Sequence, residues 1–433
     1  MRTLFKLTLA VLIAGPIACQ SPATGGDARL DAARAPEDDA AIADSGVLPD
    51  SGEVPDSGET PDAGPPDSGL PPPDPTSWAP AGELHQARAH ATATRLLDGR
   101  VLVVGGEDER RVMLASAELY DPVAGSWSDA APLPEARAHH TASLLPDGRV
   151  LIVGGGPGSE ISIPTGESAF ATVLTYDPST NTWTPTADMN VARAGHQAAT
   201  LLDGRVLVAG GGNQVGYPCN ASHPNCTVAD SLASAEIFDP VLGAWTSVAP
   251  MRQARIAFTL TTLHSGRVAA IAGAARNRSL RSAEVFDPAT STWSALPSLG
   301  TDRLFHSVAV LEDGALFVLG GKVANVRPLS QIERLDVGTT AWTASDSLPP
   351  PRTGAVAVTL LSGKPLFVGG NNQLGGAWLP NAQLFDETAS TWTETSLAVG
   401  RYGHTATVLL DGSVLVVGGI GAGGTLRSAE RSQ

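Results

Sequence analysis

A unit of about fifty residues repeats seven times along this chain of 433 residues, and no other feature constrains the fold as strongly. Every unit opens with an arginine, and the seven arginines are Arg88, Arg137, Arg193, Arg255, Arg303, Arg352 and Arg401. Their successive spacings are 49, 56, 62, 48, 49 and 49 residues. A fixed period of this length is typical of arrays and propellers, in which each unit forms one supersecondary structure that packs against its neighbours.

The signals within a unit predict β-strands. An apolar stretch after the arginine ends in a tight turn such as Asp98-Gly99 or Asp147-Gly148, and Asp-Gly between apolar stretches is a strong hairpin signal. A second apolar stretch then ends on paired glycines, as at Gly105-Gly106, although the fourth unit departs from this with Gly273-Ala274. Because no long run shows helical periodicity, we predict an all-β protein.

A third and a fourth strand follow in each unit. The third is Ser116 to Pro122 in the first unit, and it recurs closely at Ser234 to Pro240 and Ser282 to Pro288. The fourth begins at a tryptophan in six units, namely Trp127, Trp183, Trp245, Trp293, Trp342 and Trp392. These parts resemble the kelch repeat, with its glycine pair, its aromatic residue and its downstream tryptophan. The resemblance covers residues 78–433.

The resemblance implies a seven-bladed kelch-type β-propeller with four antiparallel strands per blade, the first strand lining a central channel. The seventh unit stops at Gln433 without a fourth strand or a tryptophan, whereas Trp78 stands alone before the first unit. We therefore predict that an N-terminal strand around Trp78 completes the C-terminal blade. That pairing removes the unpaired strand edges of an open ring.

The first nineteen residues are typical of an export signal. Arg2 and Lys6 precede an apolar stretch, Leu7 to Ala14, that is too short to span a bilayer. The following Gly15 to Cys19 resembles a bacterial lipobox, although Pro16 stands where a leucine-like residue is usual. We predict a signal peptide over residues 1–19 and acylation of Cys19, which gives an outer-membrane or cell-surface lipoprotein. Ordinary secretion, to the periplasm or beyond, and an uncleaved anchor are the alternatives.

Residues 20–77 have the composition of a tether. They hold thirteen acidic residues against Arg29 and Arg34 and are rich in Pro, Ser, Gly and Asp, so we predict a disordered spacer. No calcium loop of the EF-hand pattern is present. The whole chain has a formal charge of −16, which provides no basic surface for nucleic acid or for anionic lipid. We therefore expect membrane contact through a lipid anchor only, and no nucleic-acid partner.

The cysteines and tyrosines do not fit a copper radical oxidase of the galactose-oxidase type, which other kelch propellers include and which needs a cysteine cross-linked to a tyrosine. Cys19 belongs to the export signal, and Cys219 and Cys226 lie close together in one loop of an exported chain, where a local disulfide is expected. Tyr120 and Tyr176 stand at the aromatic position of the third strand. Sialidase boxes are also absent, because the tails before Trp293 and Trp392 lack the Asp and Gly. No catalytic set and no cofactor are predicted.

Two repeated polar positions receive structural interpretations. Histidines recur three residues after the arginine in four units, at His140, His196, His306 and His404. Spread around a ring, they cannot converge on one zinc ion, whose bonds to nitrogen are about 2.0–2.1 Å, so we predict no metal site there. The third strand carries a glutamate in five units, at Glu118, Glu236, Glu284, Glu333 and Glu430. We expect these to pair with the unit arginines, whereas the second and sixth units have Leu174 and Gln383 instead.

Three long loops between the second and third strands distinguish individual units. They span residues 156–172, residues 212–232 with Tyr217 and His223, and residues 371–381 with Trp378. All lie on the face opposite the Asp-Gly turns, and loops on a rigid scaffold commonly carry recognition. Neutral insertion is the alternative. We predict a binding or scaffold propeller that recognises a protein or glycan through this face, with Tyr217, His223 and Trp378 as candidate contacts. A carbohydrate-active enzyme with unidentified catalytic residues is the second hypothesis.

Overall fold

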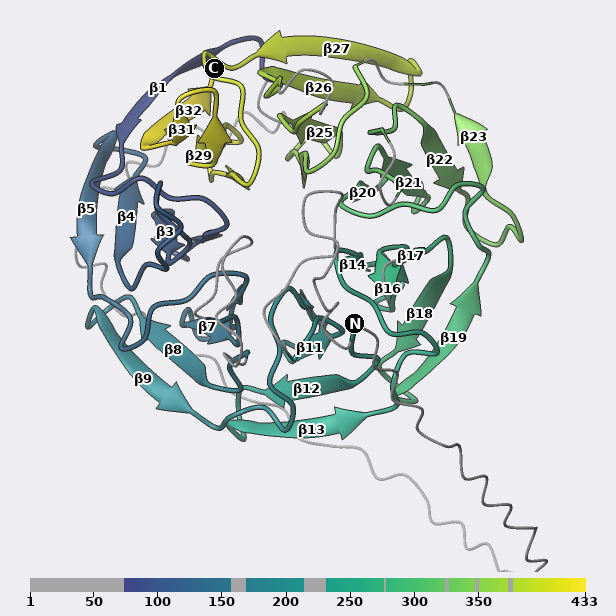
Figure 1. The fold of residues 1–433 in the computed structure, drawn as a ribbon, viewed down its shortest axis with the longest axis horizontal. Helices are drawn as coiled ribbons and strands as arrows, with labels where there is room; N and C mark the ends of the chain where they lie inside the picture. Colours follow the sequence, from purple (N-terminus) through teal and green to yellow (C-terminus); the bar gives the residue numbers. More distant parts are fainter. Residues whose placement is uncertain are drawn as a thin grey trace, which may run out of the picture. The chain divides into compact units, whose positions relative to one another are not determined.

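The computed structural model describes residues 74–156, 169–213, 231–275, 278–323, 327–345, 347, 350–372 and 377–433. The chain divides into two units, Met1–Pro66 and Asp67–Gln433, and the second contains every described residue. These residues form a ring of seven four-stranded antiparallel sheets, which confirms the predicted seven-bladed β-propeller (Figure 1). The described part of the chain contains no helix that is long and apolar enough to cross a membrane.

The two inner strands of each blade correspond to the two apolar stretches of the sequence. The first strands are β2 (Thr92–Arg95), β6 (Thr141–Leu144), β10 (Gln197–Thr200), β14 (Thr259–Thr262), β20 (Ser307–Val310), β24 (Val356–Thr359) and β28 (Thr405–Val408). The second strands are β3 (Val101–Val104), β7 (Val150–Val153), β11 (Val206–Ala209), β15 (Val268–Ile271), β21 (Leu316–Leu319), β25 (Pro365–Val368) and β29 (Val414–Val417).

The third and outer strands complete each blade. The third strands are β4 (Ala117–Asp121), β8 (Val173–Asp177), β12 (Ala235–Asp239), β18 (Ala283–Asp287), β22 (Ile332–Leu335), β26 (Asn381–Asp386) and β32 (Ser428–Ser432). The outer strands, on the rim of the ring in Figure 1, are β5 (Ser126–Ala130), β9 (Thr182–Thr186), β13 (Ala244–Val248), β19 (Thr292–Leu296), β23 (Thr343–Ser345), β27 (Thr391–Ser396) and β1 (Trp78–Glu83). Two short hairpins, β16 (Ala274–Ala275) with β17 (Arg278–Ser279) and β30 (Ile420–Gly421) with β31 (Gly424–Thr425), decorate the fourth and seventh blades.

The hydrophobic core lies between neighbouring blades. Side chains of a strand alternate between its two faces. Thus Leu102 and Val104 of β3 pack with the second blade, whereas Val101 and Val103 pack with the seventh. Both faces are buried, which explains why the second strands are continuously apolar. Each fully buried Val or Leu contributes about 1.5–3 kcal/mol.

The glycine pairs allow close contact between backbones. Gly105 and Gly106 have φ angles of 62° and 91°, and a Cβ atom on either would lie 2.5 Å from a backbone carbonyl oxygen, of Arg137 and Ala89 respectively. In the fourth unit, Arg255 donates to the carbonyl of Ala272, just as Arg88 donates to the carbonyl of Gly105. The pair position there is therefore Ala272-Gly273, one residue earlier than the predicted Gly273-Ala274.

The N-terminal strand closes the ring as predicted. Strand β1 pairs antiparallel with β32, with Trp78 opposite Ser432 and Pro80 opposite Glu430. The indole N–H of Trp78 donates to Thr395 Oγ1 of the sixth blade at 2.9 Å, and that of Trp127 donates to the Ala81 carbonyl of β1 at 2.9 Å. The closing strand is therefore hydrogen-bonded to the blades on both sides.

Candidate functional site

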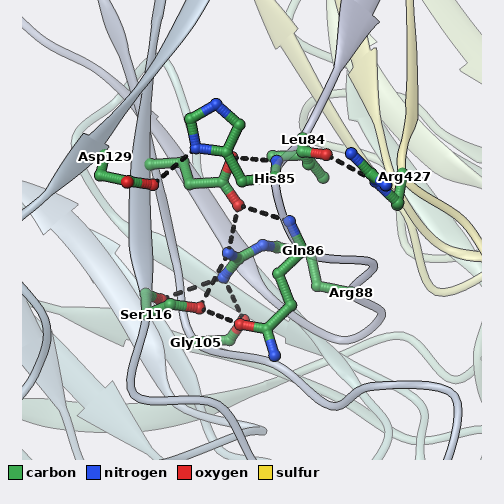
Figure 2. A network of polar contacts seen from close by, with 9 residues as sticks. Leu84, His85, Gln86, Arg88, Gly105, Ser116, Asp129 and Arg427 are labelled. Atoms are coloured by element: carbon green, nitrogen blue, oxygen red, sulfur yellow. Dashed lines mark hydrogen bonds and ion pairs between the residues drawn. The ribbon is translucent and has the colours of Figure 1, made fainter.

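The unit arginines form a buried polar network that holds the segment leading into each blade. Arg88 is 1% exposed, and its guanidinium donates to the Gly105 and Ser116 carbonyls and to Glu118 Oε1, the last at 2.6 Å. Figure 2 shows this network. Glu118 also accepts the backbone N–H groups of His85 and Gln86. One carboxylate thus fixes both the arginine and the connecting backbone, as the predicted ion pair required.

The same arrangement recurs in four other blades. The ion pairs are Arg193–Glu236 at 2.9 Å, Arg255–Glu284 at 2.6 Å, Arg303–Glu333 at 2.5 Å and Arg401–Glu430 at 2.6 Å. In each, two backbone N–H groups before the arginine donate to the glutamate. Burial lowers the pKa of these arginines, and the glutamates oppose that shift.

The second and sixth blades lack the glutamate for a reason visible in the connecting segment. The donors in the other blades stand three and two residues before the arginine. Pro349 and Pro350 occupy these positions before Arg352, and Pro134 occupies the first of them before Arg137. Proline has no N–H to donate. A buried glutamate would therefore lose half or all of its backbone partners, and Gln383 and Leu174 avoid that cost.

The histidines three residues after the arginines are buried, and three of them are hydrogen-bonded to a threonine of the neighbouring blade. Each lies against the preceding blade, where His140 bonds to Thr92 Oγ1 at 2.9 Å, His196 to Thr141 at 2.9 Å and His306 to Thr259 at 3.0 Å. Valine replaces the threonine opposite His404, since Val356 begins that blade's inner strand. Burial lowers the pKa of His140, His306 and His404 to about 3, so these imidazoles are neutral.

The blades differ in the second residue after the unit arginine. This residue directly precedes the histidine in the four blades that have one. Four blades have a small residue there, at Gly195, Ala257, Gly354 and Gly403, and the other three have His90, His139 and Phe305. All seven adopt positive φ angles between 49° and 66°. This backbone conformation is unusual for residues other than glycine, and in each blade it lies two residues before the innermost strand.

Two of these side chains belong to a cluster formed by the seventh, first and second blades. We call His90, Glu107, His139 and Tyr402 the axial cluster. The ring centroids of His90 and His139 lie 5.1 Å apart, and those of His90 and Tyr402 lie 6.0 Å apart at 71°. Gly403 is required next to them, because a Cβ there would lie 2.8 Å from His90 Nε2.

Glu107 orients the imidazole of His90. Its Oε1 atom lies 3.1 Å from His90 Nδ1, and its backbone exchanges two hydrogen bonds with Ala89. The Glu107 side chain is 1% exposed, and no hydrogen-bond partner for Oε2 is found among the described residues. A carboxylate-oriented imidazole can hydrogen-bond a ligand hydroxyl or transfer a proton. Burial lowers the pKa of neighbouring His139, so that ring is uncharged.

A second aromatic group lies in the fifth blade. Phe305 packs under Lys322, whose Nζ atom is 5.6 Å from the ring centroid. Lys322 follows the glycine pair of its blade, as Glu107 does in the first blade. The Phe305 carbonyl accepts the N–H of Gly354, and Gly354 lies against the ring of Tyr402. These contacts therefore run around the ring from the fifth blade, past the glycines of the sixth and seventh, to the second.

Most of the predicted site residues, namely the lipidation site, the disulfide and two of the three ligand contacts, lie outside the described residues. These are Cys19, Tyr217, Cys219, His223 and Cys226. Trp378 is described: it is half-buried and forms a β-bridge with Asn371 beside the inner end of the sixth blade. The axial cluster was not predicted. Comparing the seven units at the second residue after the arginine, where small and large side chains differ, would have identified His90, His139 and Phe305.

The buried tyrosines are packed as the sequence predicts. Tyr120 and Tyr176 are 2% and 0% exposed, and each packs at a tilt against the tryptophan opposite, Trp127 and Trp183, with ring centroids 5.1 and 4.9 Å apart. These aromatic pairs are part of the blade core, and neither tyrosine lies where it could face a ligand. The opposite face of the ring has an open groove between the first two blades, where Asp98 pairs with Arg100 and Asp147 with Arg149.

The fold and these repeated contacts define a seven-bladed propeller built from kelch units. Sequence models of the kelch motif match residues 136–190 in one form and residues 88–134, 193–252 and 266–300 in another. The chain therefore belongs to the kelch-repeat β-propeller family.

Two solved structures share the fold. A fungal alcohol oxidase of the AA5 family, in complex with copper, is 20% identical with a TM-score of 0.62, and the match covers 83% of this chain and 76% of that one. The structure of YjhT is 17% identical with a TM-score of 0.54, covering 72% of this chain and 98% of that one. At these identities the likeness establishes the fold alone.

Proposed function

We propose that this protein is an exported, lipid-anchored binding propeller that recognises a protein or glycan on the face of its insertion loops. The observation that carries the proposal is the axial cluster. In a ring of repeated units it introduces two histidines at a position where four blades keep a small residue, and it adds a tyrosine and a buried carboxylate beside them. Departures of this kind on a rigid scaffold are where recognition is expected.

The axial cluster lies on the same face as the insertion loops. The segment that carries His90 forms a β-bridge with Glu107, directly after the second strand, and the equivalent bridges are Ala194 with Gly212 and Thr353 with Asn371. Gly212 and Asn371 begin two of the three long loops. A ligand held by those loops would therefore lie on the face that carries the axial cluster.

The chemistry of the cluster suits a polar ligand with apolar faces. The ring of Tyr402 and, outside the cluster, that of Phe305 offer surfaces for stacking, and the Glu107–His90 pair offers hydrogen bonds to hydroxyl groups. Sugars combine both properties, and so do the aromatic and polar side chains of a protein surface.

A glycan array and a pull-down with the purified chain test this function. Once a ligand is found, His90→Ala and Tyr402→Ala should weaken binding at least about tenfold, because both residues contact the ligand centrally. Leu97→Ala, at a 65% exposed residue beside an Asp-Gly turn on the opposite face, is the matched control and should bind unchanged. Equal affinity of all three variants would reject the axial cluster as the binding site.

A carbohydrate-active enzyme is the second candidate function, and the Glu107–His90 pair is the observation that favours it. An imidazole oriented by a carboxylate is a general acid–base arrangement. Mass spectrometry of a bound glycan after prolonged incubation separates the two functions. A binding protein leaves the mass and linkage unchanged, whereas an enzyme yields a product whose formation is lost in Glu107→Gln.

The anchor is tested separately. If Cys19 is acylated, Cys19→Ala expressed in a lipoprotein-competent bacterium should move the protein from the membrane to the soluble fraction. Unchanged fractionation would reject the anchor. The local disulfide between Cys219 and Cys226 is tested by mass mapping of non-reduced peptides, and two free thiols would contradict it.

A further inference from the structure

The first blade places three metal-ligand side chains together where the closing strand meets it. Nδ1 of His85 and carboxylate oxygens of Glu118 and Asp129 all lie within 4.8 Å of one another. His85 follows β1, Glu118 lies on β4 and Asp129 on β5, and Figure 2 shows the contact between His85 and Asp129. Glu118 is buried, whereas the side chains of His85 and Asp129 are 53% and 76% exposed.

Comparison of the seven blades shows that this combination is specific to the first. The three positions are the third residue before the arginine, the third-strand residue that faces the arginine, and its partner on the outer strand. The other blades have Pro134/Leu174/Pro185, Asn190/Glu236/Ser247, Arg252/Glu284/Ala295, Gly300/Glu333/Ala344, Pro349/Gln383/Glu394 and Ala398/Glu430/Pro80. Since the glutamate and its arginine serve the fold in five blades, His85 and Asp129 are the residues that need another explanation.

We propose that His85, Glu118 and Asp129 form a zinc site. Imidazole nitrogen and carboxylate oxygen are normal zinc ligands, and three protein ligands with a water complete a tetrahedral shell. His85 Nδ1 already lies 2.7 Å from Asp129 Oδ1, so the ion replaces the proton that these atoms share.

Glu118 can serve the arginine and a metal at the same time. Its Oε1 atom accepts the guanidinium of Arg88 and the Gln86 N–H, whereas Oε2 accepts a single hydrogen bond among the described residues, from the His85 N–H at 2.7 Å. A carboxylate oxygen has two lone pairs, so Oε2 keeps one for a metal. Arg88 then orients the ligand from behind, as partners of metal-ligating carboxylates commonly do.

Zinc at this site would fasten the ring at its point of closure. His85 comes two residues after the end of β1, which supplies the outer strand of the seventh blade, whereas Asp129 lies on the outer strand of the first. The metal therefore links the N-terminal strand, which belongs to the seventh blade, to the outer strand of the first blade. Because only the folded chain brings the three ligands together, binding should raise the melting temperature.

Zinc titration of the metal-stripped full chain by calorimetry tests the proposal. The wild type should bind one equivalent that Asp129→Ala and His85→Asn lose or bind at least about tenfold more weakly. Zinc in about hundredfold excess over its dissociation constant should raise the melting temperature by a few degrees in the wild type only. His85→Asn copies the third blade, where Asn190 donates to Glu236, so this variant should fold normally.

A gain-of-function variant tests whether these three residues are sufficient for zinc binding. Asn190→His with Ser247→Asp reproduces the three residues in the third blade and should add a second zinc equivalent. The proposal is overturned if the wild type takes up no zinc at about 100 µM, or if Asp129→Ala and His85→Asn bind with the stoichiometry, affinity and thermal shift of the wild type. Binding elsewhere on the chain would be equal in all variants and is thereby distinguished.

Discussion

At the scale of single residues, the presence of the buried glutamate in a blade depends on the residues of the connecting segment before the arginine. A buried glutamate is present only where the connecting segment offers two backbone N–H groups, and it is absent where proline removes one or both. The unit arginine remains in all seven blades, because it also satisfies carbonyl groups at the ends of the second and third strands. These arginines are therefore part of the scaffold rather than an anion-binding ring.

Removing one such glutamate should be costly. Glu236→Ala leaves Arg193 buried and unpaired and deprives the Asn190 and Val191 N–H groups of their acceptor. We expect a loss of about 3–5 kcal/mol in the free energy of unfolding, measured in denaturant. Glu135→Ala is the control, because Glu135 lies 3.5 Å from Arg137 but is 48% exposed, and its loss should cost less than about 1 kcal/mol. Similar losses in both variants would contradict this account.

At the scale of strands, the tryptophans join neighbouring blades. Each of Trp127, Trp183, Trp245 and Trp342 donates its indole N–H to a backbone carbonyl near the outer strand of the preceding blade. Trp78 occupies the same place in the seventh blade and donates to Thr395. The closing strand thus carries the same contact as the strands that are continuous with their own blades.

The closure can be tested by matched substitutions. Trp78→Ala should lower the free energy of unfolding by about 3 kcal/mol, as Trp127→Ala should, because both rings pack between blades. Deleting residues 78–84 should expose the edge of β32 and promote aggregation. If Trp78→Ala melted like the parent while Trp127→Ala were crippled, the N-terminal strand would not contribute to the stability of the ring.

The strands could be predicted because their signals are local and recur seven times. An Asp-Gly turn, a glycine pair and a tryptophan can each be recognised in the sequence of one unit, and each recurs at the corresponding position of other units. The predicted register was wrong once, at the fourth glycine pair, because Ala272-Gly273 and Gly273-Ala274 each contain a single glycine. The constant spacing of seventeen residues from the arginine to the pair in the other six units would have placed it at Ala272-Gly273, where the hydrogen bond from Arg255 to the Ala272 carbonyl also places it.

At the scale of the whole molecule, the buried histidines make stability depend on pH. Burial lowers the pKa of His140, His306 and His404 to about 3 and that of His196 well below its usual value. The unfolded chain takes up these protons near pH 6.5. Stability is therefore complete above that pH and is lost as the pH falls toward 3, by up to about 1.4 kcal/mol per pH unit for each histidine.

Denaturant unfolding between pH 7.5 and 5 measures this slope. His404→Phe copies the fourth blade, which has Phe258 at this position, and should reduce the slope by the equivalent of one proton. An unchanged slope in His404→Phe would show that this histidine is not held neutral in the folded state.

The binding site could be predicted far less well than the fold. The insertion loops indicated a binding face, but the axial cluster combines two residues of the first blade with one each of the second and seventh blades, and Tyr402 lies more than 300 positions from His90 in the chain. His139 stands beside His140, and Tyr402 stands beside Arg401. Because these two neighbours recur in the repeat, the sequence pattern singles out the neighbours and not His139 or Tyr402. Only the closed ring brings Tyr402, from the last blade, into contact with His90, from the first.

Hydrogen–deuterium exchange with and without the ligand selected on the array tests the binding face most directly. We predict slower exchange in the segments around His90, His139 and Tyr402 and in the strands that follow them, because a ligand on the axial cluster would shield and stabilise these backbone groups. Protection confined to the Asp-Gly turns, such as those at Gly99 and Gly148, would place the ligand on the opposite face and contradict the account.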